Sequence, residues 1–186
     1  STDSTTAFRI QNAAGANQIS VDTAVSNGNL VTNPSAEVNT TGWTARAGTA
    51  VSRTTTAANV YYGIGAIDAN VTTGSTNSGV NYPISIPAGA TSIHVMIKAS
   101  VAGTFTFGYA YNGVDETTYR TTGCGALGGT NYYVCELVFT APAASGSPYL
   151  FIKQEDALTR HIYIDGLRVE QGGAGSPYQE GQVNLG

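Results

Sequence analysis

The sequence predicts an all-β, antiparallel sandwich. Three observations support this: apolar and polar residues alternate along many short segments, turn-forming residues separate these segments, and no segment shows convincing amphipathic helical periodicity. With 186 residues, of which 41% are hydrophobic, the chain is long enough for one such core and too apolar for a disordered tract.

Period-two alternation marks the expected strands in chain order. The alternating apolar positions are Phe8 and Ile10; Ile19 and Val21; Ile93, Val95 and Ile97; Phe105, Phe107, Tyr109 and Tyr111; and Tyr133, Cys135, Leu137 and Phe139. Turn chemistry lies between them, at Asn27-Gly28, 87–90, Asn112-Gly113 and 142–148. Regular spacing of this kind is typical of a sandwich or a barrel.

The chain divides into three segments. Residues 1–26 form an N-terminal arm with two short strands, 7–11 and 18–22, whose apolar positions are Phe8, Ile10, Ile19 and Val21. Residues 27–171 carry the regular strand series of the sandwich. Residues 172–186 form a Gly-rich tail of linker composition.

Charge and length exclude several function classes. Eight Lys and Arg against 12 Asp and Glu give a net charge of −4, which argues against a nucleic-acid partner. No apolar run is long enough to span a membrane. The only methionine is Met96, so we expect a secreted and processed product at the cell or virion surface or outside the cell.

Cys124 and Cys135 are the only cysteines, and their spacing suits one disulfide across a hairpin. Closing so short a loop would contribute about 2 to 3 kcal/mol and implies an oxidising compartment. The alternative is two buried free thiols. A zinc site is disfavoured because the two histidines, His94 and His161, lack the spacing of a ligand pair.

The two ends of the middle segment resemble a known family. The segment opens with NLVTNPSAE at 29–37 and TGWT at 41–44, and it closes with IYIDGLRVE at 162–170 and SPY at 176–178. Together these phrases resemble the jelly-roll carbohydrate-binding modules of families four, nine and twenty-two, as found in phage tail and bacterial surface proteins. The resemblance therefore implies that the sandwich is a jelly roll.

The resemblance also implies a structural calcium ion held by Glu37 and Asp165, where the first and last strands meet. Calcium takes several oxygen ligands, including carboxylates and backbone carbonyls. The alternative is that Glu37 caps a turn and Asp165 lies beside a bulge at Gly166. The sequence departs from the family at Ala36, where an aromatic residue is usual.

The resemblance implies that sugar-binding aromatic side chains lie on the concave sheet or at the loop rim, and exposed tyrosines serve protein interfaces equally well. The candidates are Tyr61, Tyr62, Tyr82, Tyr109, Tyr111 and Tyr119, with Asn81, Asn112 and Gln154 as polar partners. Any one of these tyrosines is more often a half-buried strand residue than a binding residue. The single tryptophan, Trp43, is expected in the core.

Nothing in the sequence indicates catalysis. The adjacent acid pairs Asp115-Glu116 and Glu155-Asp156 would point to opposite faces of a strand and are interpreted as solvated turns. No nucleophile elbow, zinc-protease motif or phosphate-binding loop occurs, so we expect a non-enzyme. Asn39 and Asn70 fit the N-glycosylation acceptor pattern.

Two functions remain open. A two-stranded hairpin is marginal alone in water, so the arm is expected to dock on the sheet of this domain or of another molecule, or to lead to a preceding module. Docking on another copy by β-augmentation would build a homopolymer, and we favour a structural subunit of an extracellular fibre, tail or appendage. The alternative is a glycan-binding module of a surface or phage-tail adhesin.

Overall fold

The computed structural model describes residues 29–122, 124, 129 and 131–171, together with the backbone of 6–11 and 17–22. The tail 172–186 and the side chains of Phe8, Ile10, Ile19 and Val21 lie outside the described residues. The strands are β1 (Thr6–Gln11), β2 (Asn17–Asp22), β3 (Thr44–Ala45), β4 (Thr49–Thr54), β5 (Ala66–Val71), β6 (Gly79–Pro83), β7 (Gly89–Ala99), β8 (Phe105–Ala110), β9 (Tyr119–Thr122), β10 (Tyr133–Ala141), β11 (Tyr149–Gln154) and β12 (Arg160–Gln171). A short 3-10 helix, η1 (Ala57–Asn59), is the helical element of the described part.

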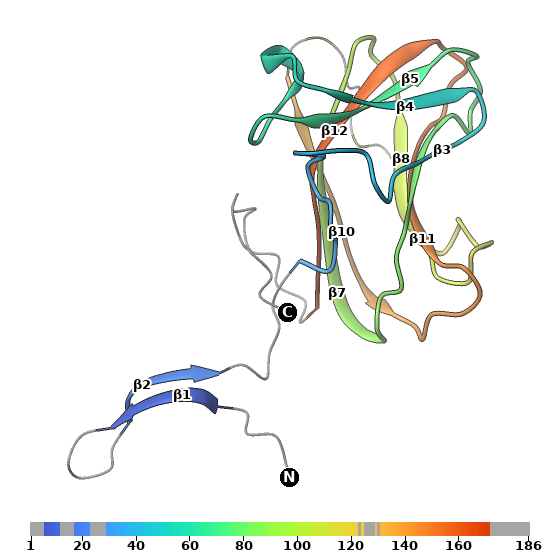
Figure 1. The fold of residues 1–186 in the computed structure, drawn as a ribbon. Coiled ribbons are helices and arrows are strands. Elements are labelled where there is room, and N and C mark those ends of the chain that lie inside the picture. Colours follow the sequence, from blue (N-terminus) through green and yellow to red (C-terminus); the bar gives the residue numbers. More distant parts are fainter. Residues whose placement is uncertain are drawn as a thin grey trace.

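Ten of these strands form two five-stranded antiparallel sheets that enclose one core (Figure 1). Sheet I has the order β10-β7-β12-β5-β4, and sheet II has the order β3-β6-β11-β8-β9. The predicted all-β antiparallel sandwich is confirmed. In the part of the chain that the structure describes, no helix is long and apolar enough to cross a membrane.

The core is built by the alternation seen in the sequence. On β8, Phe105, Phe107 and Tyr109 are fully buried in the cluster between the sheets, as predicted for this stripe. Trp43 joins the same cluster, donates Nε1–H to the carbonyl of Asn33 at 3.1 Å, and packs edge-on against Tyr82. Each large apolar side chain buried in this way contributes about 1.5 to 3 kcal/mol to folding.

The opening and closing phrases of the middle segment meet in space. The backbone N–H of Leu30 donates to the carbonyl of Val169 at 2.9 Å, and the N–H of Leu167 donates to the carbonyl of Pro34 at 3.0 Å. The side chain of Asn29 bonds β12 twice, through the carbonyl of Leu167 and the N–H of Val169. Residues 29–34 therefore run along the last strand.

A bulge interrupts β12 where it leaves β5. The pairing with β7 passes from Asp165 opposite Met96 to Arg168 opposite His94, so one extra residue is accommodated. Gly166 adopts φ +56°, and a Cβ here would lie 2.9 Å from the ring of Tyr62. The sequence-based alternative that placed Asp165 beside a bulge at Gly166 is confirmed.

The N-terminal arm forms a two-stranded sheet of its own (Figure 1). Strands β1 and β2 pair antiparallel, with Ile10 opposite Ile19 and Phe8 opposite Val21. These strands lie within one residue of the predicted ones. The arm does not complete either sheet of its own sandwich.

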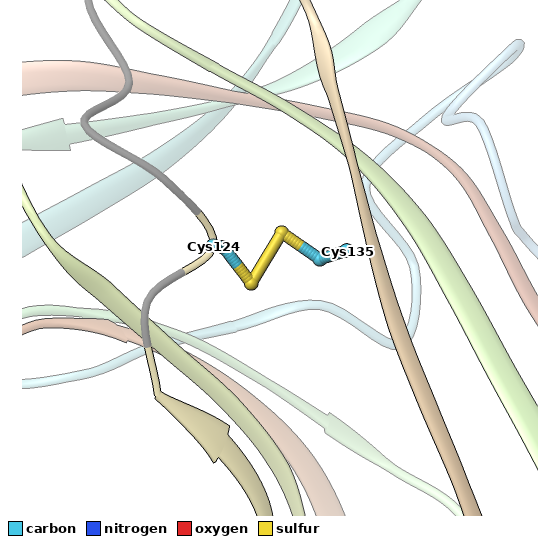
Figure 2. Close-up of a disulfide and its surroundings, with 2 residues drawn as sticks. All are labelled: Cys124 and Cys135. Carbon is cyan, nitrogen blue, oxygen red and sulfur yellow. A yellow bond between two sulfur atoms is a disulfide. The ribbon is translucent and has the colours of Figure 1, made fainter.

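The predicted disulfide between Cys124 and Cys135 is present (Figure 2). Cys135 lies on β10, the edge strand of sheet I, and Cys124 follows β9, the edge strand of sheet II. The backbone N–H of Cys124 also bonds the carbonyl of Phe105. The disulfide therefore links the edges of the two sheets through the core. The expectation that it spans a hairpin is wrong, because β9 and β10 belong to different sheets.

Removing this link should destabilise the sandwich without changing its fold. A paired Cys124→Ala and Cys135→Ala variant should lose about 2 to 3 kcal/mol of unfolding free energy, because a short loop in the unfolded chain is no longer closed. Urea unfolding of the variant and the oxidised protein measures this loss. Equal midpoints would show that the link contributes nothing.

Candidate functional site

The outer face of sheet II carries a connected group of charged and aromatic side chains. Because side chains alternate, Leu150 and Ile152 of β11 enter the core, while Tyr149, Phe151 and Lys153 point to the opposite face. The strand register aligns one row across this face: Thr44 of β3, Asn81 of β6, Phe151, Gly108 of β8 and Arg120 of β9.

Phe151 forms the floor of this face. It points away from the core and yet is only 1% exposed. A Cβ on Gly108 would lie 2.6 Å from the tip of its ring, so glycine allows the ring to lie on β8. Two cations cover it from above, with Arg46 at 5.8 Å and Lys153 at 5.6 Å from the ring centre.

Glu116 links these cations. Its Oε1 accepts from Arg46 Nη1 at 2.8 Å, its Oε2 accepts from Arg46 Nη2 at 3.2 Å, and Lys153 Nζ donates to Oε2 at 3.1 Å. The hydroxyl of Tyr149 donates to Oε1 at 2.8 Å. Burial opposes the charge on this carboxylate, but donation from Arg46, Tyr149 and Lys153 outweighs burial and lowers the pKa of Glu116.

Two adjoining hollows open beside this network. The polar hollow, of about 400 Å³, is lined by Arg46, Asn77, Glu116 and other residues. The apolar hollow, of about 560 Å³, has walls that include Pro83, Ile84 and Pro148. Asn81 and Tyr149 line both hollows. We call the two hollows and their network the sheet II site.

The network holds the polar groups of the sheet II site in fixed positions. Arg46 donates Nε–H to the carbonyl of Asn77 at 2.9 Å and Nη1–H to Oδ1 of Asn81 at 2.7 Å. Lys153 also bonds Oδ1 of Asn77 at 3.3 Å. Asn77, Asn81 and Glu116 thus hold the guanidinium of Arg46 by hydrogen bonds. These four residues line the polar hollow.

Of the aromatic residues chosen from the sequence, two are removed from candidacy by burial. Tyr109 is fully buried, and its hydroxyl accepts the N–H of Ile86 at 3.1 Å. Tyr82 is buried against Trp43, with its hydroxyl 3.0 Å from Oγ1 of Thr32. Neither ring can present a face to a sugar.

The remaining four tyrosines lie away from the sheet II site. Tyr111 and Tyr119 meet edge-on and pack against the core. Tyr61 is 49% exposed, and its ring contacts the rings of Tyr62 and Tyr132. Tyr132 in turn donates its hydroxyl to the carbonyl of Asn59. None of the four lines either described hollow.

Of the three polar residues expected to bind sugar hydroxyls beside the tyrosines, one lies in the sheet II site and two do not. Asn81 belongs to the sheet II site. Asn112 caps a turn by accepting the N–H groups of Val114 and Asp115. Gln154 is buried and bonds the carbonyls of Ser75, Asp156 and Leu158, so both are structural.

Sequence reasoning missed four central residues of the site: Arg46, Glu116, Tyr149 and Lys153. The alternation of Tyr149, Phe151 and Lys153 around Leu150 and Ile152 could have identified one face of a strand. The solvated-turn interpretation fits Asp115, whose bonds to Thr118 and Thr117 lower its pKa to about 2. It is wrong for Glu116, because three side chains from elsewhere in the fold hold that carboxylate.

The two residues of the second acid pair have different surroundings. Asp156 pairs with the buried Arg160 four residues later, while Glu155 is exposed. His94 lies near Glu136 on the outer face of sheet I, and His161 Nδ1 lies 2.8 Å from Oδ1 of Asp68. No group of three His, Cys, Asp or Glu side chains in the described residues could hold a metal ion.

The expected calcium ligands, Glu37 and Asp165, both bind the loop 60–65. Oδ2 of Asp165 accepts the N–H groups of Tyr61 at 2.8 Å and Tyr62 at 2.9 Å, and its Oδ1 accepts the N–H of Gly166 at 2.7 Å. Oε2 of Glu37 accepts the N–H of Ile64 at 2.8 Å. Both carboxylates therefore serve as anchors for backbone N–H groups.

These contacts do not fit a calcium ion, which takes six to eight oxygen ligands. Three of the four carboxylate oxygens already accept N–H groups, which leaves Oε1 of Glu37 as a buried oxygen without a hydrogen-bond partner. The nearby carbonyls of Ala36 and Glu37 accept from Arg53. The calcium assignment of Glu37 and Asp165 is thus without support in this geometry.

The two predicted glycosylation sites differ in accessibility. Asn39 is exposed in the loop before Trp43, where its Oδ1 accepts the N–H of Thr41. Asn70 is half-buried on β5, opposite His161 of β12 and Ala50 of β4. Glycosylation at either residue stays a prediction.

Comparison with known proteins shows the fold. No protein-family model and no curated protein matches the chain. Among solved structures, the xylan-binding domain CBM22-1 of Paenibacillus barcinonensis Xyn10C is 19% identical, with a TM-score of 0.63 over 82% of this chain and 99% of that one. The C-terminal family 22 module of Clostridium thermocellum Xyn10B is 16% identical, with a TM-score of 0.63 over 82% and 98%.

Two further structures extend the comparison. TmCBM61, solved in complex with β-1,4-galactotriose, is 14% identical, with a TM-score of 0.57 over 78% of this chain and 99% of that one. A domain of tailspike protein 4 from bacteriophage CBA120 is 12% identical, with a TM-score of 0.52 over 76% and 21%. The chain has a jelly-roll fold like that of carbohydrate-binding modules. The predicted resemblance is confirmed at the level of the fold.

Asp165 should give the stability of the module a particular pH dependence. Burial raises the pKa of Asp165 to about 6, although the N–H groups of Tyr62 and Tyr61 offset part of this effect. In the unfolded chain the pKa is about 4, so between these values the folded state binds the proton more tightly. The contribution of Asp165 to stability is therefore largest at low pH and declines as pH rises from about 4 to about 6.

Urea unfolding of the wild type and of Asp165→Asn between these pH values measures this slope. The variant carries a neutral side chain throughout, so the decline should be absent from it. Asp115→Asn, which removes an exposed carboxylate with a low pKa, should keep the wild-type slope. A slope that persists unchanged in Asp165→Asn would contradict the assignment.

Proposed function

We propose that the protein is a non-catalytic glycan-binding module and that the sheet II site is where the saccharide binds. The observation that supports this most strongly is the fixed Arg46–Glu116–Lys153 network beside an apolar wall. Sugars present hydroxyls at the ring edge and C–H groups at the ring face, so they need both kinds of surface. Two structural neighbours, a xylan-binding domain and a module in complex with β-1,4-galactotriose, support the same ligand class.

Tyr149 is the proposed stacking residue. It lines both hollows, and its hydroxyl bond to Glu116 fixes one edge of its ring. Burial and the neighbouring Glu116 carboxylate raise the pKa of the Tyr149 hydroxyl, which keeps the phenol neutral. A neutral ring held in one orientation loses little side-chain entropy when a sugar stacks on it.

Asn81, Arg46 and Glu116 are the proposed partners of the sugar hydroxyls. All three line the polar hollow, and the bonds among them set their positions before a ligand arrives. Charged groups form stronger hydrogen bonds with hydroxyls than neutral ones do. A preorganised set of this kind reduces the entropy cost of binding.

The comparisons favour this function over the fibre subunit that the sequence analysis preferred. Fibre assembly rests on one observation, namely that β1 and β2 pair with each other and join neither sheet of the sandwich. Such a hairpin is marginal alone in water, so docking on another copy remains a secondary proposal. The disulfide supports a location outside the cell or on a cell or virion surface for either function.

A glycan array followed by calorimetric titration of the best ligand tests the main proposal. Tyr149→Ala and Glu116→Gln should each weaken binding about tenfold or more, because one removes the stacking ring and the other removes the charge that orders Arg46 and Lys153. Tyr61→Ala, which removes an exposed ring from a loop remote from both hollows, is the matched control and should bind like the wild type. Binding lost in Tyr61→Ala and kept in Tyr149→Ala would overturn the assignment.

The secondary proposal has its own measurement. Negative-stain electron microscopy and light scattering of the full chain and of a chain without residues 1–26 compare the size of the assemblies. Arm exchange predicts filaments that vanish on truncation, because the donor strand is gone. Discrete particles of equal size in both samples would exclude it, and glycan binding should be the same in both.

A further inference from the structure

Three backbone carbonyls from two separate loops converge on one guanidinium. Arg53 donates Nε–H to the carbonyl of Ala36 at 2.7 Å and Nη2–H to the carbonyls of Glu37 at 2.5 Å and Ile64 at 3.3 Å. A cluster of carbonyl oxygens is the environment in which a protein binds a hard cation. Here a side chain of the protein itself supplies the positive charge.

The sequence and the backbone both fit this arrangement. Arg53 is placed by β4, where it lies opposite Ile67 of β5. Ala36 adopts φ +52°, a conformation that is uncommon for a residue with a Cβ and that accompanies the turn of its carbonyl toward Arg53. Gly65 is required beside it, because a Cβ there would lie 2.6 Å from both the Ala36 carbonyl oxygen and Arg53 Nε.

Donors of the protein itself hold both carboxylates of the junction, with Oε1 of Glu37 as the one buried carboxylate oxygen that has no hydrogen-bond partner. The carboxylate of Glu37 carries its negative charge on the same short segment whose carbonyls Arg53 binds. Asp165 is surrounded by N–H donors from Tyr61, Tyr62 and Gly166, which stabilise an anion and would repel a cation. A divalent ion beside the guanidinium would meet like charge and find its carbonyl ligands taken.

We propose that Arg53 is the built-in cation of this junction, so that the module folds and keeps its shape without a divalent metal ion. A planar guanidinium with five donors can bind carbonyls that diverge in direction, whereas a lysine offers a single point charge. Arg53 thereby joins the segment 36–37 to the loop 60–65, and Tyr61 of this loop also bonds Asp165 of β12.

Thermal unfolding of the full chain tests the proposal. The melting temperature should be unchanged by a chelator and by added Ca²⁺, because a ligand that does not bind the folded state cannot stabilise it. Arg53→Met should lower the melting temperature by about 4 to 8 °C, since it leaves the part-buried carbonyls of Ala36 and Glu37 without this donor. Arg120→Met, which removes an exposed arginine from β9, is the control and should change it by less than about 2 °C.

Two results would overturn the proposal. One is a saturable rise of the wild-type melting temperature with Ca²⁺ that a chelator reverses. The other is an Arg53→Met variant as stable as the wild type. Where Arg53→Met fails to fold, Arg53→Lys provides the second variant, expected to be folded and less stable than the wild type, and the wild-type calcium titration decides the question independently.

Discussion

The buried carboxylate of Asp165 is the constraint on which the closure of this sandwich depends. Asp165 directly follows the last residue of β12 that pairs with β5, and it lies at the bulge that contains Gly166. Its carboxylate accepts N–H groups from a loop more than 100 residues earlier in the chain. Next to it, residues 29–34 run along β12 and Arg53 binds the segment that follows. These contacts lie on the side of sheet I, whereas the Arg46–Glu116–Lys153 network lies on the outer face of sheet II.

The two sheets therefore carry different groups of side chains. On the side of sheet I, the exposed Tyr61 belongs to a cluster with Tyr62 and Tyr132, next to the loop anchored by Asp165. On sheet II, charged groups lie over a buried ring rather than in the core, and they hold one another in place before any ligand arrives. The sequence analysis chose tyrosines as the candidate binding residues. The sheet II site depends instead on Arg46, Glu116 and Lys153.

Much of the fold could be predicted from the sequence, because alternating apolar residues mark strands with one face in the core. On β8, for example, this alternation places Phe105, Phe107 and Tyr109 in the core. Strands β3, β4, β5, β6, β9 and β11 were not among the segments identified from alternation. In β3 and β4, Thr, Ala and Ser at an edge leave no apolar period to detect. The site was harder still. Arg46 and Glu116 lie outside regular strands and are 70 residues apart, so only the folded chain brings them to Lys153. The disulfide needed no such knowledge, since two cysteines allow one pairing.

The central claim is that saccharides bind the outer face of sheet II, and backbone NMR during titration with the best glycan ligand tests it most directly. We expect the largest, saturable shifts at Asn81, Tyr149 and Lys153, with little change in the loop 60–65. Shifts confined to that loop, or to the edge strand β10, would contradict the account and move the binding surface to the other sheet.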